Sequence, residues 1–264
     1  MKILVTVKEV AEVEDEFQIS GLDVDESYLE YDLNEWDDYA VEEAVQTSEE
    51  NDDVEVVTVT IGPERAEETV RMALAKGADR AVRVWDDALE GAEYLSVEAK
   101  AELLAAVAEE EEPDLVFSGV QAADDSNGAT GVALANKLDM EWAAVVNTLD
   151  LDIEGEVAHV HRELEGGIEE LTDVQTPAVL TIQSGINEPR YASLRGIRQA
   201  QQKPLDVHGL GDLGLDESTL DADIERTSMY EPESEGDATL WEGSAEETAG
   251  ELADFLREKG VVEG

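Results

Sequence analysis

Residues 121–131 are the part of the sequence whose residue types point most directly to ligand chemistry. They read Gln-Ala-Ala-Asp-Asp-Ser-Asn-Gly-Ala-Thr-Gly, after a short apolar run and before a helical pattern. Small residues at such a place let backbone N–H groups approach an anion at the positive end of a helix. The pattern predicts a nucleotide site, and the alternative is an ordinary loop before a helix that Ser126 caps.

Two further segments would share a pocket with this one. Asn34-Glu35-Trp36-Asp37 opens a helical pattern after the first predicted strand, and Ile61-Gly62-Pro63 follows the second. In an open parallel sheet, ligands bind beyond the carboxyl ends of the strands. We therefore expect these segments to converge with Thr6 and residues 121–131 on one crevice, which an adenine nucleotide would fit.

Side chains that could carry out catalysis form no recognisable arrangement. The sequence contains no cysteine, no G-x-S-x-G motif and no P-loop. His159 and His161 stand two apart on a predicted strand without a third ligand, so we expect exposed sheet histidines and no metal site. Residues 209–214 match G-x-G-x-x-G, but the polar, acidic segment after them is not the helix that a dinucleotide site needs, which predicts a turn. We expect a protein that is not itself an enzyme.

Residues 187–197 combine anchoring side chains with rigid flanks. They read Asn-Glu-Pro-Arg-Tyr-Ala-Ser-Leu-Arg-Gly-Ile, so that proline and glycine bracket Tyr191 and Leu194. Aromatic, aliphatic and arginine side chains in a rigid exposed segment are typical of protein-docking anchors. We expect a contact surface for another protein, although isolated exposed apolar residues also occur without a function.

The first 140 residues show the alternating elements that would position these segments. Strand patterns cover residues 2–8, 54–61, 81–84 and 115–118, and helix patterns cover 35–50, 63–75, 97–111 and 128–138. Pro63 suits the first turn of its helix, and Gly77 suits the helix end. Four successive strand–helix units predict an α/β, Rossmann-like fold, which is an open, mainly parallel sheet with helices on both faces.

The pattern changes after residue 140. Shorter strand patterns cover 143–152, 157–164, 168–171 and 177–182 and predict antiparallel additions to the sheet. The chain then loses periodicity until a last helix at 245–259, and long irregular stretches are uncommon inside compact domains. We expect a nucleotide-binding domain at 1–200 and, at 201–264, an extended C-terminal arm and helix that pack on a partner subunit. The alternative for 201–264 is a free acidic tail.

Charge is the strongest feature of the composition. Seventeen basic and 67 acidic residues give a net charge of −50, which excludes nucleic acids and anionic membranes as partners. Because the acids are spread through every predicted element, we interpret them as an adaptation to very high salt, where charges are screened within ~3 Å at 1 M. The longest apolar run, residues 103–108, is six residues long, and a membrane span needs ~18. A strand pattern follows Met1 directly, so we expect a cytoplasmic protein without a leader.

Four blocks of the sequence resemble the beta subunits of electron transfer flavoproteins. The first is Ile-Leu-Val-Thr-Val-Lys at 3–8, and the second is 62–69 with Gly-Ala-Asp-Arg at 77–80. The third is 121–131. The fourth is Arg-Glu-Leu-Glu-Gly-Gly-Ile-Glu at 162–169, which continues through 177–179 to the 187–194 segment quoted above. The resemblance covers nearly the whole chain.

This resemblance implies a heterodimer with an alpha subunit, FAD shared with that subunit, and AMP as a structural nucleotide in the beta chain. It implies that electrons arrive from flavin dehydrogenases, such as acyl-CoA dehydrogenases, and pass to a membrane quinone oxidoreductase. The AMP contacts that it implies are Thr6, Asn34, Glu35, Trp36, Asp37, Ile61, Val120, Gln121, Ala122, Ala123, Asp124, Asp125, Ser126, Asn127, Gly128, Ala129 and Thr130.

The resemblance also implies roles outside the AMP site. Trp36 takes the place of an aromatic residue near the flavin, and Val13 stands where another aromatic is often found. Glu163 matches a carboxylate that pairs with the mobile flavin domain of the alpha subunit. The implied docking residues for the dehydrogenase are Pro189, Arg190, Tyr191, Leu194 and Ile197.

Departures from the family pattern leave alternatives open. Glu35 replaces a proline, and Arg195 replaces the proline that usually follows the residue matched by Leu194. One alternative is an electron-bifurcating relative with a second FAD in place of AMP, although residues 127–131 look closer to the AMP type. Another is an ATP-binding sensor of the stress-protein kind, which leaves 187–197 unexplained. A third is an adenylating enzyme, whose triphosphate the acids of 10–15 would repel.

Overall fold

The computed structural model describes residues 1–92, 94–222, 224–231 and 239–262. These residues belong to two compact units, which extend over Met1–Met229 and Tyr230–Gly264. The larger unit contains the sheet, and the smaller contains one helix, α7 (Ala245–Glu258). Part of the expected C-terminal arm, at 223, 232–238 and 263–264, lies outside the described residues.

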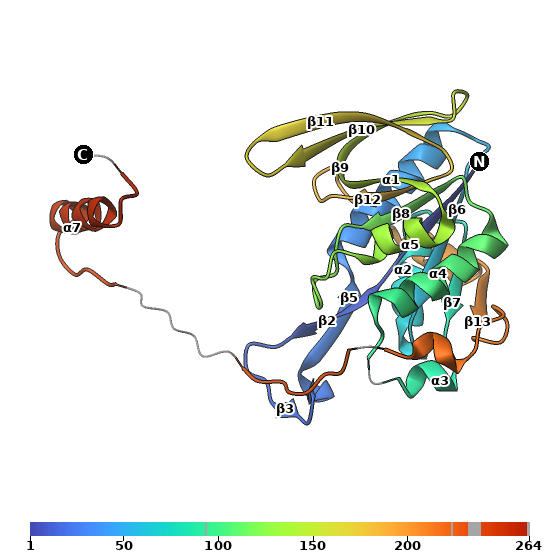
Figure 1. Ribbon diagram of the computed structural model, residues 1–264, viewed down its shortest axis with the longest axis horizontal. Helices are drawn as coiled ribbons and strands as arrows, with labels where there is room; N and C mark the ends of the chain where they lie inside the picture. Colours follow the sequence, from blue (N-terminus) through green and yellow to red (C-terminus); the bar gives the residue numbers. More distant parts are fainter. Residues whose placement is uncertain (93, 223, 232–238, 263–264) are drawn as a thin grey trace. The chain divides into compact units, whose positions relative to one another are not determined.

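A nine-stranded sheet forms the centre of the larger unit (Figure 1). In spatial order the strands are β11 (Ile168–Gln175), β10 (Val157–Leu164), β9 (Glu141–Asp152), β12 (Ala178–Ile182), β8 (Leu115–Gly119), β1 (Lys2–Thr6), β6 (Glu55–Ile61), β7 (Arg80–Val84) and β13 (Leu205–His208). The strands β9, β12, β8, β1, β6, β7 and β13 run parallel to one another. Strand β10 then pairs antiparallel with β9 and with β11. The expected α/β fold with antiparallel additions is confirmed.

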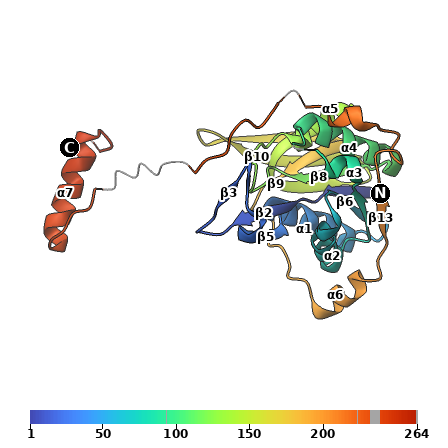
Figure 2. The same ribbon diagram turned by 90° about the horizontal axis from the view of Figure 1, so that it is seen from below.

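Helices cover both faces of the sheet (Figure 2). One face carries α1 (Glu35–Glu50) and α2 (Glu67–Lys76), with α6 (Leu194–Ala200) against α2; the other carries α3 (Asp87–Glu90), α4 (Val97–Glu111) and α5 (Thr130–Leu138). Successive strand residues point to opposite faces, so Ile3 and Val5 join the core under α1, whereas Leu4 joins the core under α4. Burial of these two apolar layers holds the sheet between the helices.

The direction in which strands are added reverses at β1. From β1 the chain passes through α1 to β6 on one side, and it later passes through α4 to β8 on the other side. Open α/β sheets bind ligands at such a reversal, beyond the carboxyl ends of the strands. The fold therefore identifies the ends of β1, β6 and β8 as the region to examine for a site.

Several local predictions are confirmed. The helices at 35–50 and 97–111 have the expected bounds. A short 3-10 helix, η2 (Glu64–Ala66), precedes α2, and α2 ends before Gly77, whose φ is +147°. A side chain at Gly77 would also place its Cβ 2.5 Å from Cγ1 of Val45, so glycine is needed there for close packing of α2 on α1.

The segment between the first strand and α1, in which the sequence showed no strand pattern, forms regular structure. It contains the antiparallel pair β2 (Glu9–Val13) and β5 (Leu29–Leu33), the short pair β3 (Ile19–Ser20) and β4 (Asp23–Val24), and the 3-10 helix η1 (Glu26–Tyr28). Acidic residues between the apolar ones hid the alternation that is typical of strands.

Three further expectations need correction. The strand at 177–182 was expected to be antiparallel, but β12 runs parallel between β8 and β9 and is buried throughout. Strand β9 is 12 residues long and begins two residues before the expected 143–152. Residues 205–208 form β13 at the edge of the sheet, where only irregular structure was expected, because four residues are too few to show a period.

Ser126 does not cap the helix that follows it. The helix begins at Thr130 with Ala129 at the N-cap position and no side-chain cap hydrogen bond. Ser126 has φ +50° and lies in the preceding loop, so the backbone has not yet taken the direction of the helix there.

Helix α7 agrees closely with the expected helix at 245–259. Ser244 accepts a hydrogen bond from the Glu247 N–H, and the Glu247 carboxylate accepts one from the Ser244 N–H, which is a capping box. Trp241 packs edge-on against Phe255 with ring centroids 5.5 Å apart. Within the described residues, no helix has the length and apolar composition that a membrane crossing requires.

Candidate functional site

The residues predicted to bind a nucleotide gather at the carboxyl ends of β1, β6 and β8. Thr6 ends β1, Ile61 ends β6, and Val120 follows the end of β8. Helix α1 begins at Glu35 and contacts β8 and β1. Because β1 lies between β6 and β8, the expected convergence of these segments at one edge of the sheet is confirmed.

Asn34 joins the start of α1 to the 121–131 segment. Its Nδ2 donates to the Gln121 carbonyl (2.9 Å), and its Oδ1 accepts from the Ala123 N–H (3.2 Å). The residue is 1% exposed and makes no side-chain cap bond to its own helix, because the loop uses its amide. A carboxylate at this position would accept but not donate, so the sequence needs an amide here.

Asp37 lies beneath Asn34 in the first turn of α1. Its two carboxylate oxygens accept from the backbone N–H groups of Lys8 (2.8 Å) and Gly119 (3.0 Å). The Lys8 N–H follows β1, and the Gly119 N–H lies at the end of β8. The Asp37 side chain therefore connects both strand ends to α1. Burial raises the pKa of Asp37 to about 7, although the two backbone hydrogen bonds act in the opposite direction.

Glycine permits the close approach of these elements. A Cβ at Gly119 would lie 2.6 Å from Oδ1 of Asp37 and 2.7 Å from Cβ of Trp36. A Cβ at Gly131 would lie 2.7 Å from Cγ2 of Thr181. Real Cβ atoms do not approach other heavy atoms so closely, so α1 and α5 can sit against the strand ends only because both positions lack a side chain.

Two lysines hold the exposed acids of the 121–131 segment. Lys8 Nζ pairs with Asp124 (2.5 Å) and with Asp125 (3.1 Å), and Lys100 Nζ pairs with Asp125 (2.9 Å). Burial acts to raise the pKa of Asp125, but Lys100, the Asn127 N–H and Lys8 outweigh it and lower the pKa to about 2. The two lysines therefore offset the negative charge of these two acids.

The first turn of helix α5 differs from those of α1, α2 and α4 in its charge. It contains no acidic residue, whereas α1, α2 and α4 each have one or more there. Gly128, with φ +60°, shapes the turn before it. In a chain with 67 acidic residues, such a start leaves the positive end of the helix for an external anion.

A hollow of about 520 Å³ lies next to Gln183, which contacts Trp36. Gln183 connects the hollow to Trp36, because its Oε1 accepts from the Trp36 indole N–H (3.2 Å) and the residue also lines the hollow. The lining residues are Val145, Asn147, Thr148, His161, Glu163, Gln183, Ser184 and Gly185.

The backbone around this hollow is irregular. Val145 has φ +63°, which is a strained conformation for a β-branched residue. The pairing of β9 shifts register against β12 and again against β10 between His161 and Arg162. Such bulges are frequent next to functional sites, where they redirect side chains.

A polar atom of a residue that lines this hollow lacks a partner. Asn147 Oδ1 is buried and makes no hydrogen bond within the described part of the chain, whereas His161 Nε2 lies 3.4 Å from a carboxylate oxygen of Glu169. Unpaired buried polar atoms are costly unless a ligand, water or partner satisfies them. Sequence reasoning found Glu163 here but missed Asn147 and Gln183, because bulges and a positive φ at valine leave no sequence signal.

Three of the five expected docking side chains are exposed. Tyr191 is 99% exposed, Leu194 78% and Ile197 41%. Leu194 begins α6, with Ser193 as its N-cap. Arg190 lies in ion pairs with Glu42 and Glu49, Pro189 is partly buried, and Val13 ends β2 with 47% exposure.

The two strand histidines each face a carboxylate on β11. His159 Nδ1 lies 2.6 Å from Asp173, and His161 Nε2 lies 3.4 Å from Glu169. The Asp173 carboxylate raises the pKa of the exposed His159. Over the described ranges, no group of three or more histidine or carboxylate side chains could hold a metal ion.

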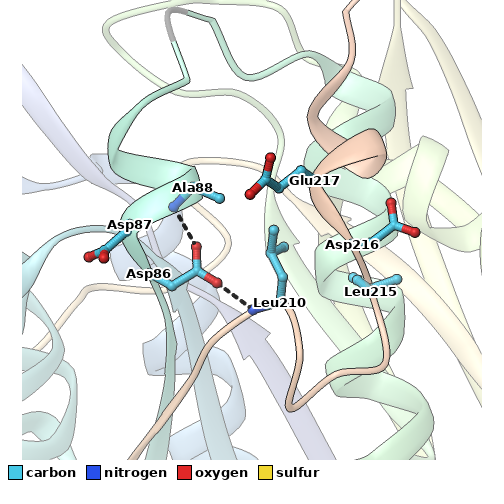
Figure 3. Close-up of a pocket in the computed structure, with 7 residues that line it drawn as sticks. All are labelled: Asp86, Asp87, Ala88, Leu210, Leu215, Asp216 and Glu217. Atoms are coloured by element: carbon cyan, nitrogen blue, oxygen red, sulfur yellow. Dashed lines mark hydrogen bonds between the residues drawn. The ribbon is translucent and has the colours of Figure 1, made fainter.

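The expected turn at 209–214 is confirmed. The Leu210 N–H donates to Asp86 (2.8 Å), which also accepts from the Ala88 N–H and caps α3 (Figure 3). The adjoining hollow, of about 540 Å³, is lined by four carboxylates, those of Asp86, Asp87, Asp216 and Glu217. Carboxylates would repel a phosphate, so the match to G-x-G-x-x-G does not make a dinucleotide site.

Comparisons with known proteins agree with this arrangement. Residues 21–213 match the model of the electron transfer flavoprotein domain. The chain is 48% identical to an electron transfer flavoprotein subunit beta of Methylophilus methylotrophus over 264 residues, which cover 98% of both chains. Identity to the subunit beta of Mus musculus is 36% over 266 residues, with 99% of both chains covered. Identity to that of Bacillus subtilis is 32% over 263 residues, 99% of this chain and 100% of the relative.

These matches extend over nearly the full length of the chain, and they give no support to the stress-protein and adenylating-enzyme alternatives. The chain therefore belongs to the electron transfer flavoprotein family, among its beta subunits.

Proposed function

We propose that this chain is the rigid platform of a heterodimeric electron carrier. In this proposal it binds AMP at the ends of β1, β6 and β8 and forms one wall of an FAD site shared with the alpha subunit. Electrons arrive from flavin dehydrogenases, such as acyl-CoA dehydrogenases, and leave to a membrane quinone oxidoreductase. The observation that carries the proposal is the buried network of Asn34 and Asp37, which joins the start of α1 to the ends of β1 and β8 and to the 121–131 segment.

The residues at this edge fit an adenylate. The first turn of α5, which contains no acidic residue, suits its phosphate. The pairing of Asp124 and Asp125 with lysines reduces repulsion of a negative ligand. We propose that Thr6 and the backbone at 127–130 contact the AMP, because Thr6 ends β1 and residues 127–130 lead into α5.

The hollow beside Trp36 fits a flavin wall. It has a ligand-sized volume of about 520 Å³, and its lining includes the polar side chains of Asn147, Thr148 and Ser184. The Gln183 side chain holds the Trp36 indole in one orientation, and the exposed Glu163 carboxylate offers a cation partner to the alpha subunit. FAD, when bound, would supply the redox chemistry, and this chain would supply position and insulation.

Docking would rest on apolar contact. The chain carries a net charge of −50, and at molar salt charge steering of partners is largely screened. Leu194 and Tyr191, which are 78% and 99% exposed, would then provide most of the recognition.

Reduction of the alpha–beta complex by a purified acyl-CoA dehydrogenase with its acyl-CoA substrate tests this function. Flavin absorbance should bleach, and Leu194→Ala should lower kcat/KM at least about tenfold, as for a central interface anchor. Val207→Ala is the control, because Val207 is an exposed apolar residue of the edge strand β13. A complex without flavin, or equal rates for both variants, would contradict the proposal.

A further inference from the structure

The guanidinium of Arg190 faces helix α1. Its Nε and Nη2 donate to the two carboxylate oxygens of Glu42 (2.8 and 3.0 Å), and its Nη1 and Nη2 donate to Glu49 (2.6 and 2.9 Å). The Arg190 backbone N–H also donates to Glu42 (3.1 Å). An arginine side chain has five N–H donors, so these four contacts leave little hydrogen-bonding capacity for another protein.

Glu42 is a buried anchor. The residue is 3% exposed, and its carboxylate also accepts from Gln46 (2.7 Å). Burial acts to raise the pKa of Glu42, but the hydrogen bonds from Arg190 and Gln46 outweigh it and lower the pKa. A bidentate arginine–carboxylate pair of this kind fixes geometry as well as charge.

The same segment is held at two further points. Asn187 Nδ2 donates to Glu43 of α1 (2.9 Å). At the downstream end, Arg71 of α2 donates to the carbonyls of Ala200 (2.8 Å) and Lys203 (2.9 Å). The backbone between these points carries the exposed Tyr191 and Leu194, so polar contacts on both sides fix the position of apolar side chains that face solvent.

We infer that Arg190 is a positioning residue, which clamps this backbone onto α1 and does not itself contact the dehydrogenase. The inference rests on the proposed docking function of residues 187–197 and revises the part that Arg190 plays in it. A segment that is already ordered before binding does not lose conformational entropy when the partner arrives. The clamp therefore acts on affinity, and it leaves the electron-transfer step unchanged.

Three variants of the alpha–beta complex separate the clamp from direct contact. The double variant Arg190→Met with Glu42→Gln removes both members of the buried ion pair. It therefore leaves no unpaired buried charge, which could otherwise prevent folding. Arg190→Lys keeps the positive charge and loses the fork. Leu194→Ala removes an exposed apolar side chain and leaves the clamp intact.

Each variant is measured in two ways. The first is reduction by a purified acyl-CoA dehydrogenase with its acyl-CoA substrate, analysed as KM for the complex and kcat. The second is hydrogen exchange, in the absence of the dehydrogenase, of the backbone amide at position 190, which donates to Glu42, and of that of Ile197, which donates to the Ser193 carbonyl. Both Arg190 variants should raise KM about tenfold with kcat unchanged, since about 1.4 kcal/mol corresponds to tenfold, and should speed exchange. Leu194→Ala should raise KM without faster exchange.

Other outcomes overturn the inference. Unchanged exchange in both Arg190 variants would show that no clamp exists. A wild-type KM for Arg190→Lys, together with a raised KM for the double variant, would show that the charge itself meets the partner. A raised KM for Leu194→Ala alone would remove the positioning role but keep the docking function. Unchanged KM in all three variants would overturn the docking function, and the positioning role with it.

Discussion

Replacing Asp37 by asparagine should change how the stability of the chain depends on pH. Burial raises the pKa of this carboxyl from the ordinary 3.8 to about 7. The native state therefore keeps a proton that the unfolded state has already released between these two pH values. The contribution of Asp37 to stability is complete below pH 3.8 and is lost as pH rises through about 7.

The pKa difference sets the size of this effect. One pH unit corresponds to about 1.36 kcal/mol, so a rise from 3.8 to about 7 corresponds to about 4 kcal/mol. A measurement from pH 5 to pH 8 avoids the range in which the many other carboxylates titrate, and about 3 kcal/mol of the loss falls there. Native proteins are stable by only about 5–15 kcal/mol, so the change is large.

Urea unfolding of the wild type and of Asp37→Asn at constant ionic strength measures it. Asparagine cannot accept both backbone hydrogen bonds, but this loss lowers the free energy of unfolding of the variant by the same amount at every pH. The free energy of unfolding of the variant minus that of the wild type should therefore increase by about 3 kcal/mol from pH 5 to pH 8. Subtraction removes the background of the other acids. A difference that stays constant with pH would refute the reasoning, because Asp37 would then titrate alike in both states.

Two further predictions concern the same edge of the sheet. Gly119→Ala should destabilise the chain by about 1–3 kcal/mol, because the new Cβ would meet Asp37 and Trp36. The control is Gly211→Ala, since no atom lies within 4 Å of a Cβ at that position. Equal urea midpoints for the two variants would contradict the packing argument. Asn34→Ala should lower the free energy of unfolding by about 1–3 kcal/mol and speed hydrogen exchange of the Ala123 amide, since two hydrogen bonds to the 121–131 segment are lost. Unchanged exchange would show that Asn34 does not hold this segment.

Periodicity in the sequence predicted the central part of the fold. The apolar spacing of 35–50 and 97–111 gave both helices their observed bounds, because these helices bury one continuous face against the sheet. The convergence of Thr6, Ile61 and residues 121–131 followed from the rule that parallel strands end at one edge. These features depend on short-range patterns and on connectivity, both of which a single sequence displays.

Other features depend on contacts between distant residues. The four residues of β13 pair with β7, but they are too short to show alternation. The insertion of β12 between β8 and β9 depends on sheet order, which local sequence does not encode. The hollow beside Trp36 arises from two register shifts and a positive φ at Val145, and the inward role of Arg190 depends on acids more than 140 positions away.

Extraction of the nucleotides from the purified alpha–beta complex, with identification by mass and quantification, tests the central claim most directly. The account predicts one AMP and one FAD for each heterodimer, and loss of the AMP, with retention of FAD, in the Asn34→Ala complex. Two FAD molecules and no AMP, or a wild-type complex without any adenine nucleotide, would contradict it.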